Sequence, residues 1–221
     1  MKKIFFISIC TLITSFIGAQ NYQAGDHELA VIPTAYTMEK GQAYFTDWEL
    51  FLINYTYAPT NKTHISFLSL FPLTTEFIET ISLGIKHQYL NNENLKAALI
   101  ATYTPKSQFS SIGTVFSFGE NPTGLHLGAG ILNFVDDDGD VRHQELIYFA
   151  GYRTDLSQRT SFMFEYANFN TLAEAEFNVM ISLGYRFRTH NETWDLSGIR
   201  PLESTGDFLF APLLKATFLI D

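Results

Sequence analysis

The sequence has very little cysteine and, beyond its first residues, no long hydrophobic run. Its one cysteine, Cys10, lies in an apolar N-terminal stretch that we expect to be removed. The remaining chain then offers neither a thiol nucleophile nor a disulfide framework. From residue 20 onward no segment approaches about 18 consecutive apolar residues, the length at which a membrane-spanning helix is considered. A helical membrane protein is therefore excluded.

Clusters of basic residues are also absent. The chain holds 14 Lys and Arg against 23 Asp and Glu. Loss of an N-terminal piece that carries Lys2 and Lys3 would change the formal charge from −9 to 12 − 23 = −11. Because phosphate contacts require clustered Lys and Arg, we expect no nucleic-acid partner. No pattern in the sequence indicates a cofactor, and none is predicted.

The first nineteen residues have the organisation of a secretory signal peptide. Lys2 and Lys3 form a basic start, residues 4–17 are largely apolar, and Gly18 and Ala19 supply small residues at a cleavage point. We predict a signal peptide at 1–19 and one mature domain at 20–221. An uncleaved anchor is the alternative, although the apolar stretch is shorter than the roughly 20 residues of a comfortable span.

The decisive pattern in the mature chain is strict alternation of apolar and polar residues. Successive side chains of a strand point to opposite faces, so this pattern predicts strands with one apolar and one polar face. The clearest example is residues 177–187, where Phe177, Val179, Ile181, Leu183, Tyr185 and Phe187 alternate with Asn178, Met180, Ser182, Gly184 and Arg186.

The alternation recurs along the chain and predicts about twelve strands, with ten as the alternative. The least certain are the first strand and the one at 193–200. Turn-forming residues separate the strands. The predicted ranges are 28–38, 43–57, 63–71, 79–90, 95–104, 112–119, 124–134, 144–153, 159–168, 176–188, 193–200 and 208–220.

Two kinds of connection alternate between these strands. The shorter ones are 58–62, 91–94, 120–123, 155–158 and 189–192. The longer or more irregular ones are 72–79, 105–111, 135–143, 169–175 and 202–207. An even number of antiparallel strands joined in this way is typical of a transmembrane barrel with short periplasmic turns and longer outside loops.

Taken together, the signal peptide, the alternating strands, the two kinds of connection and the aromatic last strand resemble the outer-membrane β-barrel proteins of Gram-negative bacteria. Tyrosines near the predicted strand ends agree with this resemblance. Phe218 is not the final residue, so the last strand matches the class only in part. The resemblance implies an all-β fold, a single antiparallel barrel integral to the outer membrane, with outer-membrane lipid and the barrel assembly machinery as partners. The oligomeric state stays open.

A soluble periplasmic barrel of the lipocalin kind, or a β-sandwich, also gives alternating strands and remains an alternative. If the apolar faces meet lipid, the polar faces line the lumen. We predict that a network of paired charges fills this lumen, because an unpaired buried charge is costly. The luminal candidates are Lys86, Lys96, His126, Glu165, Arg186 and Lys215.

The preferred function is structural or is passive permeation of small solutes, without enzymatic chemistry. If a water path exists, the excess of Lys and Arg over Glu165 in the predicted lumen favours anions. Acids of an inward-folded loop at Asp136–Asp140 would instead neutralise the lumen and close it.

The alternative from another class is a lipid-acting enzyme at the barrel rim. His64 and Ser66 are two residues apart on one strand face and resemble the arrangement in outer-membrane phospholipases. In those enzymes the site faces lipid, whereas in this chain the apolar residues of the strand are predicted to form the lipid-facing side. We therefore predict no enzyme activity.

An acidic run at 135–141 is a weak candidate for calcium. The spacing of Asp136, Asp138 and Asp140 suits a calcium-binding loop. Gly139 precedes Asp140, whereas the EF-hand pattern needs glycine after that position, and no glutamate closes the loop. A solvated outside loop is the preferred interpretation, and no metal site is predicted.

Overall fold

A computed structural model describes residues 25–49, 51–72, 75–119, 122–135, 141–168, 179–189, 191–202 and 210–220. Twelve antiparallel strands and one short 3-10 helix, η1 (Thr75–Thr80), account for most of these residues. The strands are β1 (Ala43–Trp48), β2 (Leu52–Thr60), β3 (Thr63–Leu70), β4 (Ser82–Asn91), β5 (Leu95–Thr104), β6 (Phe109–Phe118), β7 (Gly124–Val135), β8 (Val141–Asp155), β9 (Thr160–Asn168), β10 (Val179–Arg188), β11 (Glu192–Pro201) and β12 (Ala211–Ile220).

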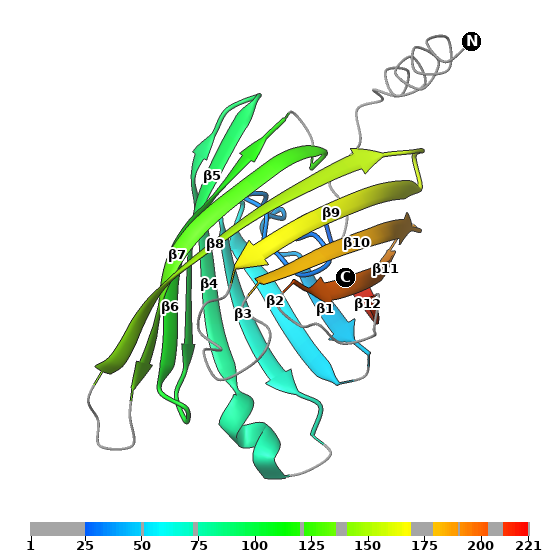
Figure 1. The fold of residues 1–221 in the computed structure, drawn as a ribbon. Coiled ribbons are helices and arrows are strands. Elements are labelled where there is room, and N and C mark those ends of the chain that lie inside the picture. The colour runs from blue at the N-terminus through cyan, green and yellow to red at the C-terminus, as the bar shows by residue number, and fades with distance from the viewer. Residues whose placement is uncertain are drawn as a thin grey trace.

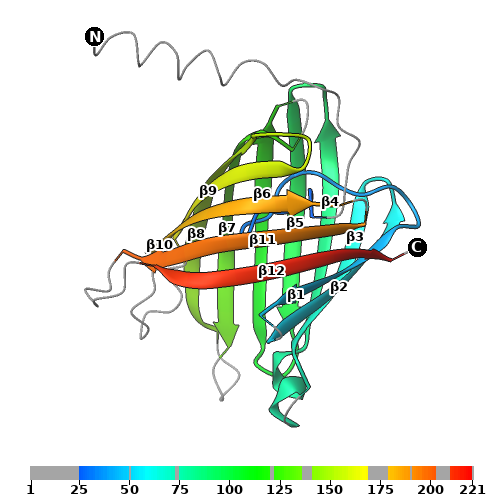
Figure 2. The same ribbon diagram turned by 90° about the vertical axis from the view of Figure 1, so that its right-hand side faces the viewer.

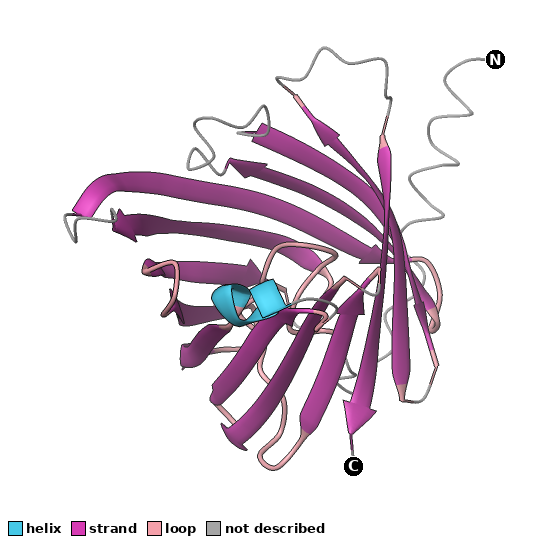
Figure 3. Ribbon diagram, turned by 90° about the horizontal axis from the view of Figure 1, so that it is seen from below, coloured by secondary structure: helices cyan, strands magenta, loops and turns pink. Residues whose placement is uncertain are grey.

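The strands form one closed barrel in which each strand pairs with its neighbours in sequence. β1 closes the ring on β12, with Ala43 opposite Ile220 and Trp48 opposite Lys215. Figures 1 and 2 show the tilted strands running around the wall, and Figure 3 looks onto the end that carries η1. Closure leaves no open sheet edge, so the backbone groups of the wall can pair with one another.

The two faces of the wall have opposite chemistry, as the sequence pattern predicts. On β10 the side chains of Ser182 and Arg186 are buried, whereas Leu183, Tyr185 and Phe187 are 39%, 49% and 48% exposed. The same arrangement recurs on β4, where Leu83 and Ile85 are exposed. A soluble barrel would bury its apolar side chains, so this outward apolar face is the arrangement expected against lipid.

Several exposed aromatic side chains lie on the outer face near one end of the barrel. This end, called the turn end below, carries the connections 61–62, 92–94, 119–123, 156–159 and 189–191, together with the start of β1 and the end of β12. Such rings of aromatic residues are typical of the headgroup level of a membrane. The exposed aromatic residues here are Tyr57, Tyr89, Phe118, Tyr152, Phe187 and Trp194.

The predicted fold class and the count of twelve strands are confirmed, but two of the predicted strands are wrong. Residues 28–38 are not part of the wall, and residues 43–57 form two strands, β1 and part of β2. Between these strands the chain turns at Glu49, which has a positive φ of 56°, and the amide of Phe51 donates to the carbonyl of Trp48. A non-glycine residue rarely adopts this conformation, and glutamate gives no signal for it.

The opposite end of the barrel, called the loop end, carries the connections 49–51, 71–81, 105–108, 136–140, 169–178 and 202–210. The predicted alternation of short and long connections therefore holds except at 49–51, 105–108 and 136–140, none of which is longer than the turn-end connection 119–123. In the part of the chain that the structure describes, no helix is long and apolar enough to cross a membrane.

Residues 25–42, called the luminal segment below, lie inside the barrel. Figures 1 and 2 show this segment, in blue, enclosed by the strands. It forms a tight turn of its own, in which the amide of Leu29 donates to the carbonyl of Ile32 and that of Thr34 donates to the carbonyl of His27. Leu29, Ile32, Thr34, Ala35 and Tyr36 are almost completely buried. The lumen is thus filled by a piece of the chain that precedes the wall.

The outward face yields a first prediction. Leu183→Arg, in the middle of β10, should lower the free energy of unfolding from lipid vesicles by about 2–4 kcal/mol, because the cation would enter hydrocarbon. Leu156→Arg is the matched control in the turn 156–159, where Leu156 is exposed and the expected cost is about 0–1 kcal/mol. Urea titrations in vesicles measure both changes, and equal losses would contradict the assignment of the faces.

Candidate functional site

Strand register places a continuous row of polar side chains across one side of the lumen. Residues directly opposite each other on neighbouring strands are in contact range. Asp155 of β8 lies opposite Ser161 of β9, and Ser161 lies opposite Arg186 of β10. Arg186 lies opposite Asp195 of β11, and Asp195 lies opposite Lys215 of β12. Trp48 of β1 completes this row, called the charged row below, opposite Lys215.

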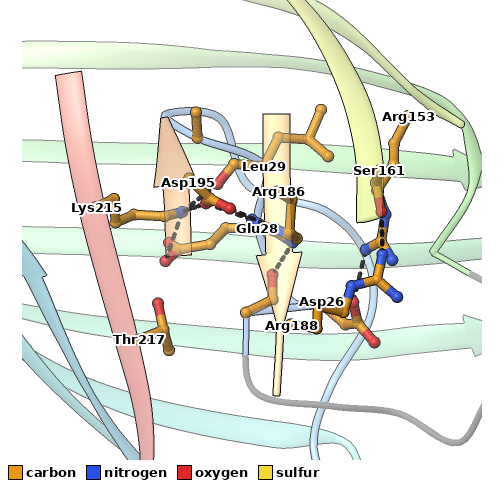
Figure 4. Close-up of polar contacts among 12 residues, drawn as sticks. Asp26, Glu28, Leu29, Arg153, Ser161, Arg186, Arg188, Asp195, Lys215 and Thr217 are labelled. Atoms are coloured by element: carbon orange, nitrogen blue, oxygen red, sulfur yellow. Dashed lines mark hydrogen bonds and ion pairs between the residues drawn. The ribbon is translucent and has the colours of Figure 1, made fainter. Parts of the chain in front are cut away.

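A buried ion-pair network occupies the centre of the charged row (Figure 4). The Arg186 guanidinium makes a bidentate interaction with the Asp195 carboxylate. Its Nε donates to Oδ1 at 2.7 Å and its Nη2 donates to Oδ2 at 2.7 Å. The Lys215 ammonium lies 3.1 Å from the same carboxylate. All three side chains are 0% exposed. Two cations therefore share one wall carboxylate, which leaves a positive charge to be matched.

A second cluster lies at the β8 end of the row, near the turn end of the barrel. Asp155 accepts from Ser161 Oγ at 2.6 Å, from Arg188 Nη2 at 2.9 Å and from Arg153 Nε at 3.3 Å. Arg188 also donates to Ser161. Here again two guanidinium groups share one wall carboxylate, and both are buried.

The luminal segment supplies acids to both clusters (Figure 4). Asp26 Oδ1 accepts from Arg153 Nη1 at 2.6 Å, and Glu28 Oε1 lies 3.3 Å from Lys215 Nζ. Backbone carbonyls add to this charge matching, because Gly25 accepts from Arg186 Nη1 at 2.6 Å and Leu29 accepts from Lys215. The charges of the wall are thus completed by two carboxylates two residues apart in the segment.

The rest of the luminal segment is held by other strands around the barrel. Glu165 of β9 accepts from the amides of Val31 and Ile32 at 2.9 and 3.0 Å. On β4, Lys86 Nζ donates to the carbonyls of His27 and Thr34 at 2.9 and 3.2 Å. These bonds matter because a buried backbone group without a partner is costly.

Beyond Thr34 the segment continues along β6, β4 and β3. Ser117 Oγ accepts from the amide of Ala35 at 2.8 Å, and Gln88 donates to the carbonyl of Ala35 at 2.8 Å. The amide of Met38 donates to His64 Nε2 at 2.7 Å. The wall therefore provides both donors and acceptors along the segment, as a specific docking site does.

Tyr36 fixes the segment against β5 and β7. Its hydroxyl donates to the carbonyl of Gly119 at 3.0 Å, and Lys96 Nζ lies 5.2 Å from the centre of its ring. His126 meets the same ring edge-on, and it is held by Ser117 at 2.8 Å and by the carbonyl of Pro122 at 3.1 Å. His126 is thus a packing residue for the segment.

Burial and neighbouring charges set the protonation of two residues in the segment. Desolvation lowers the pKa of His27 to about 4, although Glu28 opposes this shift. Burial by itself would raise the pKa of Glu28, but Lys215, His27 and Arg186 together outweigh it and hold this pKa below its ordinary value. At neutral pH the segment therefore presents a neutral imidazole, stacked on Tyr44 at 3.9 Å, and an ionised carboxylate.

The structure brings all six luminal candidates into polar or ring contact with the segment: Lys86, Lys96, His126, Glu165, Arg186 and Lys215. Parity alone could have indicated four further luminal residues, since they also alternate with outward apolar residues: Arg153, Asp155, Arg188 and Asp195.

Two other sequence candidates have different outcomes. The weak calcium candidate Asp136–Asp140 lies outside the described residues. Within the described ranges, no group of three or more His, Cys, Asp or Glu is placed to hold a metal ion. His64 is buried in the lumen, and its Nε2 accepts from Met38.

No protein-family model matches the chain, and no curated protein matches it. Among solved structures, the outer membrane protein Omp33 of Acinetobacter baumannii is 10% identical with a TM-score of 0.43, over 81% of this chain and 96% of that one. The NanC porin is 8% identical with a TM-score of 0.44, over 80% and 97%. OmpF of Salmonella typhi is 10% identical with a TM-score of 0.40, over 77% and 62%.

The ion-pair network yields a second prediction. Asp195→Asn should lower the free energy of unfolding by about 3–5 kcal/mol, because it leaves Arg186 and Lys215 buried without their shared acid. Glu93→Gln is the matched control in the exposed turn 92–94, where no measurable change is expected. Urea unfolding in lipid vesicles compares them, and a loss below about 1 kcal/mol at Asp195 would refute a structural role for the network.

Proposed function

We propose that this chain is an integral outer-membrane β-barrel for passive permeation of small solutes, and that the luminal segment controls the path. The observation that carries the proposal is the docking of residues 25–42 inside a closed barrel whose outer face is apolar. Export by a signal peptide at 1–19 belongs to the proposal and supplies the route to the outer membrane.

The outward face supports residence in a membrane. Leu83, Tyr185 and Leu196 are 50%, 49% and 54% exposed on three different strands. Exposed apolar area of this extent is rare on a soluble monomer. A lipocalin-like periplasmic barrel would place such side chains inside and its charges outside, the reverse of this arrangement. The soluble alternative therefore has less support.

Membrane residence is tested by fractionating cells that express the full precursor. We expect the protein in the outer-membrane fraction after a carbonate wash, with a mass reduced by removal of residues 1–19. A periplasmic protein that the wash releases would refute the outer-membrane proposal.

The width of the barrel supports a role in permeation. Side chains can fill a barrel of about eight strands, whereas 16–18 strands leave an aqueous channel. A twelve-stranded wall lies between these cases. Here the extra space is taken by a separate segment, held by polar contacts, rather than by large side chains of the wall. Displacement of such a segment would open a polar path without breaking the wall.

A lipid-acting enzyme at the rim has less support from the geometry. His64 lies in the lumen, with its Nε2 taken by the backbone of the luminal segment. A general base must reach both its nucleophile and the substrate. Lipid on the outer face does not meet His64, which is 2% exposed.

Control by the segment is tested in planar bilayers. Asp26→Asn combined with Glu28→Gln removes the two carboxylates that pair with cations of the wall. Loss of each buried pair should weaken docking of the segment by about 2 kcal/mol or more. We expect the conductance of single barrels to rise several-fold over that of the unaltered protein. Glu39→Gln is the matched control, because Glu39 is an exposed acid of the same segment.

A steric variant provides an independent way to displace the segment. A Cβ at Gly151 of β8 would lie 2.5 Å from the side-chain ends of both Ile32 and Leu29. Gly151→Leu should therefore raise conductance without changing any charge. Conductance that stays at the original level in this variant and in the double variant would refute control by the segment.

A further inference from the structure

The charges of the lumen do not balance without the luminal segment. Among the described residues of the strands, six cations point inward: Lys86, Lys96, Arg153, Arg186, Arg188 and Lys215. Four acids do so: Glu145, Asp155, Glu165 and Asp195. These described wall residues thus carry an excess of two positive charges, and Asp26 and Glu28 supply two negative ones. Paired charges are far less costly to bury than unpaired ones, so the wall requires an anionic occupant.

Each segment carboxylate occupies a distinct cationic position. At the first, Arg153 Nη1 lies 2.6 Å from Asp26 while Arg153 also meets Asp155. A planar guanidinium binds carboxylates with directional, charge-assisted hydrogen bonds. At the second, Lys215 lies 3.3 Å from Glu28, and Arg186 contributes a further positive charge. The two positions are parts of one site, since Asp26 and Glu28 are two residues apart (Figure 4).

We propose that these two positions form a binding site for small organic dicarboxylates, and that Asp26 and Glu28 occupy it as a built-in ligand. This inference rests on the proposed function, since the site becomes accessible from the lumen when the segment leaves. The solute then meets the same partners, Arg153 at one carboxylate and Lys215 at the other.

The wall also explains why the site selects anions with more than one carboxylate. Asp155 and Asp195 each already hold two cations, so one added carboxylate at each cluster completes the pairing. A monocarboxylate completes only one cluster. A cation finds Arg153, Arg186, Arg188 and Lys215 around it and is repelled.

Binding can be measured without any current through the barrel. The sequence holds two tryptophans, and Trp194 on the outer face can be replaced by Phe. The remaining Trp48 donates to the carbonyl of Ala30 at 3.3 Å, and Lys215 Nζ lies 5.8 Å from its ring centre. Its fluorescence therefore reports on the second cationic position.

The experiment titrates succinate into the full chain that carries Trp194→Phe, Asp26→Asn and Glu28→Gln. We expect a saturable change in Trp48 fluorescence with succinate, about tenfold weaker binding of acetate, and no response to the neutral isostere succinamide. In a KCl gradient the same variant should give an anion-selective reversal potential.

Further variants assign the site. Lys215→Met should weaken succinate binding by about tenfold or more, and Arg153→Lys should weaken it while keeping the charge. Lys96→Met is the matched control, because Lys96 is a buried wall cation that contacts Tyr36 and Asn92 and neither segment carboxylate. Folding of each variant is checked by its shift in electrophoretic mobility on heating.

The outcomes separate this inference from the proposed function. Equal responses to succinate and succinamide, no response to succinate, or binding that Lys215→Met leaves unaltered would each overturn the dicarboxylate site. A cation-selective reversal potential would overturn it as well, even where conductance rises. Succinate binding with unchanged conductance would uphold the site and refute control of permeation by the segment.

Discussion

Closure of the wall by antiparallel pairing is the constraint on which the rest of the structure depends. Once β1 pairs with β12, the register around the ring is fixed, and with it the face that every side chain takes. A shift of one residue would turn Arg186 toward the outside and Tyr185 toward the lumen. The apolar belt and the charged interior are therefore two consequences of a single arrangement of backbone hydrogen bonds.

The closed wall creates a problem that the luminal segment solves. Inward charges such as Arg186 and Lys215 are cut off from bulk water, and a dry interior penalises any charge without a partner. The segment brings carboxylates to these cations and carbonyls to Lys86, while Glu165 accepts from its amides. Wall and segment thus satisfy each other's buried polar and charged groups.

The same physics links docking of the segment to passage of a solute. The contacts that hold Asp26 and Glu28 are side-chain ion pairs rather than an apolar core, so an anion in the lumen can replace them group for group. Apolar packing of Leu29 and Ile32 against Met163 adds affinity for the segment that a small solute lacks. The balance between binding of the segment and binding of a competing anion sets how often the lumen is open to solutes.

The sequence by itself determined the fold class and the face of most side chains, because alternation with a period of two is a local property of the chain. It also reached the right count of strands through two errors that cancel. Residues 28–38 contain β-branched residues and resemble a strand, yet Pro33 and the turn from His27 to Thr34 keep them out of the wall. The sequence does not predict the turn at Glu49, because glutamate rarely adopts the positive φ that this turn requires.

Only the tertiary structure decided which inward residues meet. The row from Asp155 to Lys215 joins residues from five strands, and its composition depends on register, which no short stretch of sequence specifies. The sequence suggested acids of the loop 136–140, which lies outside the described residues, as the groups that neutralise the lumen. In the structure, Asp26 and Glu28 provide carboxylates from the start of the domain. Their role depends on contacts over more than a hundred residues, and such contacts exist only after the ring has closed around the segment.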